Sequence, residues 1–294
     1  MSVVLKARPA EPEYRAIHRV ADALAPGMAN TFVEAVRRVA GETALSELEA
    51  ALARGDLAAA EAAVPWEKLP AELAPVGAAI RTGFEQAAQA SVRYLPPRLR
   101  LELRFDLLNP RAVDWVRTHS GELIREVTDE TRLAVREVIR RAFEEGMHPY
   151  TSARHIRSMV GLTRRQAQAV DNFRRRLVEE GVAGEKLDKR VEAYRQRLVR
   201  WRAKNIARTE TLRASNEGQQ ELWRQAAEQG LIDPAVTRKE FITTPDDRLC
   251  DICAPLDGQR VGLEESFQTE LGPVLTPPVH QQCRCAMRLV EVRP

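Results

Sequence analysis

Apolar residues recur at helical spacing along most of the chain, and this pattern predicts a mostly α protein. The longest apolar face lies within 111–145, where Ile124, Val127, Val135 and Val138 follow one another at spacings of three or eight residues. Such spacing places side chains on one side of an α-helix. Charged residues fill the other positions, so one buried and one solvated face are expected. Residues 189–229 repeat the pattern and predict one long helix or two in line.

Shorter helices are predicted for the N-terminal third, where proline and glycine mark the breaks. Residues 1–12 are expected to form an extended arm because of Pro9 and Pro12. Pro26-Gly27 is expected to end the first helix, and Asn30 to cap the next. The expected helices span 13–25, 31–40, 43–54, 57–64 and 73–92, with turns at Pro65, Pro70 and Pro75.

Residues 99–108 alternate apolar and charged side chains, which predicts a strand or an extended arm that pairs with a neighbouring subunit. A boundary is expected near Asn109-Pro110. The chain therefore divides into an N-terminal helical or adapter region at 1–109, a central helical body at 110–232 and a C-terminal Cys/His metal-binding module at 233–294.

Residues 151–180 predict a helix, a turn at Gly161 and a second helix, the order of a helix-turn-helix. Thr163 and Gln166 match a capping box at the start of the second helix. Five arginines of this second helix are candidate contacts for DNA: Arg164, Arg165, Arg174, Arg175 and Arg176.

The charge is small overall but unevenly placed. The 294 residues carry a formal net charge of +3, yet residues 161–210 hold 14 Lys and Arg against 7 Asp and Glu. Residues 211–294 hold 9 against 13. The basic stretch could face DNA phosphates without sequence preference, or it could be a solvated helix surface with intrahelical ion pairs. No apolar run is long enough to span a bilayer and no signal peptide precedes the helices, so synthesis in the cytoplasm is expected.

All four cysteines lie near the C-terminal end, together with one histidine. The candidate metal ligands are Cys250, Cys253, His280, Cys283 and Cys285. A C-x-x-C pair and a distant H-x-x-C-x-C cluster suit a tetrahedral zinc ion, and a closed site of four protein ligands holds structure rather than doing chemistry. The sequence does not decide which four bind. Two disulfides are the alternative.

Strand patterns surround these ligands and predict a small β-hairpin module. Residues 238–243 alternate, and 256–261 contain Asp257-Gly258, a turn signal. Residues 287–292 are expected to return as a final strand. Asp247 and Arg248 are expected to form a charge-assisted pair beside the first two cysteines.

Three segments carry a resemblance to a known family. They are D-R-L-C-D-I-C-A-P-L-D-G from Asp247 to Gly258, P-P-V-H-Q-Q-C-R-C from Pro277 to Cys285, and A-R-T-E-T-L-R-A-S-N from Ala207 to Asn216. Together they resemble the phage Mu F-like minor head proteins, also called phage head morphogenesis proteins. The resemblance covers the last third to half of the chain. Its motif residues outside the metal ligands are Arg208, Thr209, Glu210, Asn216, Asp247, Arg248, Asp257 and Gly258.

The resemblance implies a structural protein of the virion, located at the head or portal vertex of a phage or prophage. It implies contact with the portal protein and with major capsid or scaffold proteins, and a role in head morphogenesis, DNA packaging or ejection. Structural zinc is expected from the ligand spacing, no membrane contact from the lack of a long apolar run, and no enzymatic activity from the lack of a catalytic pattern. Copy number, symmetry and the identity of the portal partner do not follow from the resemblance.

Two other classes of function compete with this interpretation. One is a zinc-containing enzyme, either a nuclease or an ADP-ribosyltransferase that uses Glu210. The remaining histidines, His18, His119, His148 and His155, are scattered, and no G-x-x-x-x-G-K-[ST] phosphate loop occurs, so no catalytic residue is assigned. The other is a DNA-binding regulator built on 151–180. Base-specific DNA binding that survives moderate salt would distinguish such a regulator from a virion protein.

Overall fold

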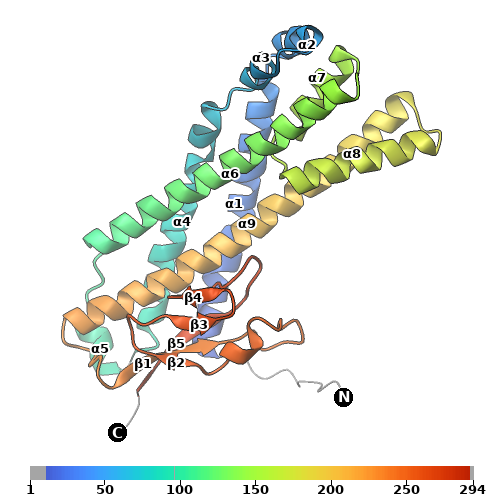
Figure 1. Ribbon diagram of the computed structural model, residues 1–294. Coiled ribbons are helices and arrows are strands. Elements are labelled where there is room, and N and C mark those ends of the chain that lie inside the picture. Colours follow the sequence, from blue (N-terminus) through green and yellow to red (C-terminus); the bar gives the residue numbers. More distant parts are fainter. Residues whose placement is uncertain (1–10, 96, 292–294) are drawn as a thin grey trace, which may run out of the picture. The chain divides into compact units, whose positions relative to one another are not determined.

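The structure is a computed structural model that describes residues 11–95 and 97–291 (Figure 1). It confirms the mostly α fold with a small antiparallel β region near the C-terminal end. The arm expected at 1–12 and residue 292 of the last expected strand fall largely outside this range. Across the described residues, none of the helices combines the length and apolar character that crossing a membrane requires.

Helices account for most of the described residues. They are α1 (Pro12–Gly41), α2 (Leu45–Arg54), α3 (Leu57–Ala62), α4 (Lys68–Val92), α5 (Pro97–Glu102), α6 (Pro110–Glu144), α7 (Pro149–Met159), α8 (Arg164–Glu179) and α9 (Gly184–Glu228). The other elements are a short 3₁₀-helix η1 (Ala254–Leu256) and strands β1 (Thr237–Ile242), β2 (Arg260–Val261), β3 (Phe267–Thr269), β4 (Gly272–Val274) and β5 (Ala286–Glu291).

The chain forms two compact units, each assembled from separate stretches of sequence. The sheet unit contains the described residues of 1–26, 78–118 and 205–294, and the helical unit contains 27–77 and 119–204. Helices α1, α4, α6 and α9 contribute residues to both. This grouping by contact differs in kind from the three consecutive segments expected from sequence, and the boundaries at 109 and 232 remain a prediction.

The predicted end of the first helix at Pro26 is wrong, because Pro26 lies inside α1. Proline inside a helix removes one hydrogen bond and costs about 3 kcal/mol. The helix continues because apolar side chains are buried on both sides of the proline, Ile17 and Ala21 before it and Phe32 and Val36 after it. Their burial outweighs one lost bond.

The turns predicted at Pro70 and Pro75 are also wrong, since both residues lie within α4. Leu73, Val76 and Ile80 of this helix are fully buried, and their packing again offsets the local cost of proline. The boundaries between the two units fall after Pro26 in α1 and two residues after Pro75 in α4.

The strand predicted at 99–108 is wrong. Its first part is helix α5, and the following residues run without regular structure. Side-chain amides of α9 replace a neighbouring strand here. Gln225 accepts from Asp106 N at 2.7 Å and donates to Asp106 O at 3.0 Å, and Gln229 does the same for Arg104 at 3.2 and 3.0 Å. The extended backbone is therefore satisfied without a sheet.

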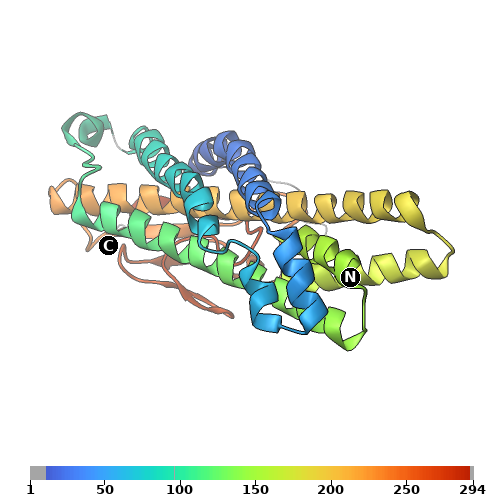
Figure 2. The same cartoon turned by 90° about the horizontal axis from the view of Figure 1, so that it is seen from above.

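The cap predicted at Asn30 is wrong, because Asn30 lies inside α1, whereas the capping box predicted at Thr163 and Gln166 is confirmed. Gly55 ends α2 in the left-handed conformation, and Asp56 Oδ1 accepts from Ala59 N at 2.9 Å at the start of α3. Thr163 and Gln166 form both bonds of the capping box. Figures 1 and 2 show α8 antiparallel to the first part of α9. A turn at Gly161 joins α7 to α8, with φ of 93°.

The sheet unit contains a three-stranded antiparallel sheet in the order β2-β1-β5. Its central strand β1 pairs along its whole length with β5, from Thr237 opposite Glu291 to Ile242 opposite Ala286. Strand β1 also pairs with β2 as predicted. The Asp257-Gly258 turn, however, joins η1 to β2 and does not close a two-residue hairpin. The tight hairpin is β3–β4, which the sequence analysis missed.

Helix α9 lies against α4 in the sheet unit at a point where only glycine fits. A Cβ atom at Gly218 would overlap the carbonyl oxygen of Phe84. Because the overlap would be with backbone atoms of α4, no side chain could rotate away to relieve it.

Replacing Gly218 by alanine should lower the free energy of unfolding by about 3 kcal/mol, because the new methyl group forces the two helices apart. Gly121→Ala in α6 is the matched control, since a Cβ there meets nothing within 4 Å. That change should raise the free energy of unfolding by about 0.8 kcal/mol through helix propensity alone. Denaturant titration measures both. Equal effects of the two substitutions would contradict the close approach.

Candidate metal centre

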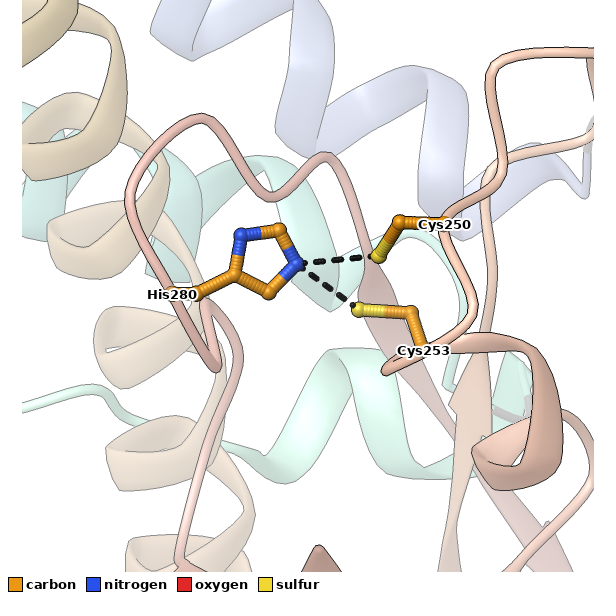
Figure 3. A group of neighbouring side chains, drawn as sticks. All are labelled: Cys250, Cys253 and His280. Carbon is orange, nitrogen blue, oxygen red and sulfur yellow. Dashed lines mark hydrogen bonds between the residues drawn. The ribbon is translucent and has the colours of Figure 1, made fainter. Parts of the chain in front are cut away.

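Three of the predicted ligands converge directly (Figure 3). Nε2 of His280 lies 3.1 Å from Sγ of Cys250 and 3.3 Å from Sγ of Cys253. Cys250 and Cys253 come from the loop between β1 and η1, and His280 from the loop before β5. Segments that lie about thirty residues apart in sequence thus meet at one point.

The other two cysteines form a second triplet that shares Cys253 with the first. Sγ of Cys253 lies 3.7 Å from Sγ of Cys283, and Cys253, Cys283 and Cys285 have their sulfurs within 4.8 Å of one another. Cys253 belongs to both triplets. All four cysteines are free thiols, so the disulfide alternative is not what the structure contains. The five predicted ligands form one cluster that could hold a metal ion.

The tautomer of His280 is fixed by its neighbour. Nδ1 lies 2.8 Å from the carbonyl oxygen of Gln281. A carbonyl oxygen only accepts, so Nδ1 carries the proton in neutral imidazole, and the lone pair of Nε2 faces the two sulfurs. This is the arrangement in which a histidine side chain binds a metal ion.

The pKa values of the four thiols are shifted in different directions. Hydrogen bonds from the Cys253 and Cys285 thiols lower the pKa of Cys283, and the same contacts raise the pKa values of Cys253 and Cys285. Burial opposes a lowered pKa at Cys250, but hydrogen bonds with the backbone and side chain of Cys253 prevail and lower it. The cluster therefore favours a thiolate within a ring of thiol donors, and thiolate is the form that binds metal ions.

Short backbone turns hold the ligands in place. The amide nitrogens of Cys253 and Ala254 both donate to the Cys250 carbonyl, at 3.1 and 3.0 Å. Cys283 N donates to His280 O at 3.1 Å. Each C-x-x-C or H-x-x-C spacing is thus closed by one turn, which directs both side chains of a pair to the same side.

The R-T-E-T-x-x-A-x-N motif supports the second ligand loop from α9. Thr209 Oγ1 accepts from Gln282 N at 3.1 Å, and Gln282 has a positive φ of 63°. Asn216 Nδ2 donates to Leu212 O at 2.9 Å and to Cys285 O at 3.5 Å. Two motif residues of the helix therefore bond to backbone on either side of Cys283.

Arg284 ties the ligand loops to the N-terminal helix. Its guanidinium donates to both carboxylate oxygens of Asp246, at 2.6 and 2.7 Å, and lowers the pKa of that carboxyl. Its carbonyl oxygen accepts from Nε2 of His18 at 2.9 Å.

The predicted Asp247–Arg248 pair is wrong, because Arg248 donates to Asp246 at 2.8 Å and Asp247 is exposed.

Other motif residues serve local structure. Asp257 Oδ1 accepts from Thr243 N at 3.1 Å and from Thr243 Oγ1 at 2.8 Å, which fastens the end of β1. Gly258 adopts φ of 75°, a conformation that favours glycine. Glu210 is buried and lies 3.4 Å from Arg213 Nε, while Arg208 is half-buried and near His18. None of these four residues contributes an atom to the thiol cluster.

The predicted DNA-contact arginines lie apart from the metal cluster, in the helical unit. Arg164, Arg165, Arg175 and Arg176 are exposed on α8, and Arg174 is half-buried.

Sequence reasoning missed His18 and Asp246, which hold the loop of Arg284 beside the ligands. His18 lies 266 residues from its partner, so no local pattern could have revealed it.

Replacing Thr209 by valine should destabilise the second ligand loop, because the Gln282 amide loses its acceptor at a cost of about 1 kcal/mol. Thr211→Val is the matched control. The Thr211 hydroxyl donates only to carbonyls of its own helix, at 2.8 and 3.3 Å, so its loss should change little. Hydrogen exchange of the amides from 280 to 285 measures the effect. Faster exchange in both variants alike would contradict the assigned role.

Comparison with known proteins bears on the same segment. Residues 168–288 match the family model described as phage Mu protein F like protein. Searches of curated proteins and of solved structures gave no significant match. The matched segment begins within α8 and contains α9, both ligand loops and strands β1–β4. The resemblance predicted from the three motifs is confirmed, and through residues 168–288 the chain carries a phage Mu F-like region.

Proposed function

We propose that this chain is a minor structural protein of phage heads that acts in head morphogenesis at the portal vertex. The observation that carries the proposal is the Mu F-like match, because it spans the ligand loops and the helix that supports them. In this role the protein contacts the portal protein and the capsid or scaffold proteins around it. A part in DNA packaging or ejection belongs to the same proposal.

The metal ion of this proposal is zinc, bound by Cys250, Cys253, His280 and Cys283. Three thiolates and one imidazole are a donor set that zinc favours. With Zn–S bonds of about 2.3 Å, tetrahedral geometry sets sulfurs about 3.8 Å apart. The 3.7 Å between Cys253 and Cys283 agrees with that spacing, so Cys283 is preferred to Cys285 as the fourth ligand.

A site of four protein ligands leaves no position for water or substrate, so zinc here would stabilise structure. Binding would join two loops that otherwise depend on a few backbone turns. Zinc-finger-like modules gain on the order of 10 kcal/mol from their metal. We assign no catalytic role to Glu210, whose carboxylate is buried beside Arg213.

Exposed leucines near the start of α6 provide a surface for the head partners. Leu101 is 92% exposed and Leu108 is 82% exposed, the two highest values among the large apolar side chains that are exposed in the described ranges. Both flank the segment that Gln225 and Gln229 hold in an extended form. In the proposed role this segment is where the sheet unit meets the portal protein.

Cys253→Ser should abolish zinc binding, because Cys253 belongs to both triplets of ligands. Residues 237–291 should then become sensitive to protease while the helical circular dichroism signal persists. Cys285→Ser is the matched control and should retain zinc. Metal analysis of the purified variants measures both outcomes.

Retention of zinc by Cys253→Ser would overturn the proposed centre. Loss of zinc in Cys285→Ser together with retention in Cys283→Ser would instead assign the fourth position to Cys285. Neither result would contradict the family match, which rests on the sequence of residues 168–288.

The head role predicts that the protein sediments with heads. Phage heads assembled from portal and capsid proteins in the presence of this chain should carry it in far fewer copies than the major capsid protein. Gradient sedimentation followed by mass spectrometry measures this. Recovery of the chain only at the top of the gradient, with portal-containing heads fully formed, would contradict the proposal.

A further inference from the structure

A cavity of about 970 Å³ opens in the helical unit, away from the cysteines and the family motifs. Four elements line it: the C-terminal end of α1, helix α7, helix α8 and the first part of α9. Figures 1 and 2 show α8 and this part of α9 side by side. The lining is rich in charge, with six basic and three acidic side chains.

Two of the six cations are already neutralised within the wall. Lys189 lies 2.7 Å from Glu185, and Arg195 donates to both carboxylate oxygens of Glu192, at 2.8 and 2.7 Å. Asp188 is the third acidic residue of the lining. These pairs leave an excess of positive charge that comes entirely from arginines.

Four arginines of the lining have no carboxylate oxygen within 4.0 Å in the described part of the chain. They are Arg37, Arg154, Arg157 and Arg174. Arg154 donates to the hydroxyl of Tyr150 at 2.8 Å, which adds no negative charge. Arg157 and Arg174 are half-buried, so their charges are only partly hydrated. Arg157 lowers the pKa of Glu192 through charge attraction, but neither Arg157 nor Arg174 forms an ion pair within 4.0 Å in the described ranges, so both can accept a further anionic partner.

The arrangement is more than the solvated face of one helix. Arg37 comes from α1, Arg157 from α7 and Arg174 from α8, so three helices direct guanidinium groups to one cavity. A histidine in the same wall is held in a fixed orientation. His155 Nε2 lies 2.5 Å from Asp171 Oδ1, and the other oxygen of Asp171 accepts from Arg141 at 2.6 Å.

We propose that this cavity binds the phosphate backbone of double-stranded DNA, with Arg37, Arg157 and Arg174 as the phosphate contacts. The planar guanidinium matches two phosphate oxygens at once, which favours phosphate over a single carboxylate. The cavity volume greatly exceeds that of one inorganic phosphate ion, so a polymer with repeated phosphates suits it better. Recognition is independent of base sequence, since only backbone contacts are involved.

This inference deepens the proposed head function, because a protein at the portal vertex meets packaged DNA. It does not depend on the metal centre. The sequence predicted DNA contacts on the exposed surface of α8, whereas the proposed site is a cavity. Only Arg174 belongs to both sets of residues. DNA binding by the purified chain and sedimentation with heads are separate measurements, so the two proposals fail separately.

The test is fluorescence anisotropy of a labelled, mixed-sequence DNA duplex titrated with the full chain between about 50 and 200 mM salt. The variant Arg37→Gln/Arg157→Gln/Arg174→Gln should lower the slope of log affinity against log salt by about 3. Its affinity at 0.1 M salt should fall on the order of 100-fold. The corresponding triple lysine variant should retain most of the slope, and thermal melting checks that all variants are folded.

The matched control is Arg54→Gln/Arg125→Gln/Arg200→Gln, which removes the same charge from exposed positions outside the cavity. It should change the slope by less than 1 unit. An equal loss in both triple variants would overturn the site, since general charge would then explain binding. Competition by poly-glutamate as effective as competition by unlabelled duplex would also overturn it, in favour of an acidic protein partner. Full competition by low inorganic phosphate would reduce the site to a small-anion site.

Discussion

The buried polar face of α9 is the constraint on which the sheet unit depends. This face contains Thr209, Asn216 and Gln220, which are at most 3% exposed. Each makes a bond to backbone outside its own helix, such as Gln220 Nε2 to Leu263 O at 2.6 Å. A buried polar group without a partner costs about 1–3 kcal/mol, so an alternative placement of the ligand loops would lose several bonds together.

The candidate ligands are also part of the apolar core of the sheet unit. Cys253, Cys283 and Cys285 are each at most 2% exposed and pack in one cluster with Phe241 and Phe267. The two rings meet edge to face with centroids 5.1 Å apart. The sulfurs therefore serve as small apolar side chains as well as ligands. A substitution that spares the charge balance of the site still disturbs core packing.

The sequence predicted most of what local chemistry decides. The capping box at Thr163 is set by residues close together, and the meeting of the Cys and His segments is set by fixed ligand spacing. It failed where distant packing decides. Pro26 stays inside a helix because of apolar burial on both sides, and residues 103–106 stay extended because Gln225 and Gln229 supply the bonds. The partner of Arg248 was missed by one residue, since adjacent aspartates look alike in sequence.

The sheet unit joins residues near both ends of the described chain. Tyr14 and His18 of α1 bond to residues of the last fifth of the sequence, Thr244 and Arg284. A ribosome must therefore deliver the final strand before the first helix finds its partners. The residues of the helical unit, by contrast, all precede residue 205. A prematurely terminated polypeptide that ended before residue 280 would lack His280, Cys283 and Cys285, so only longer products can form the complete thiol and imidazole cluster.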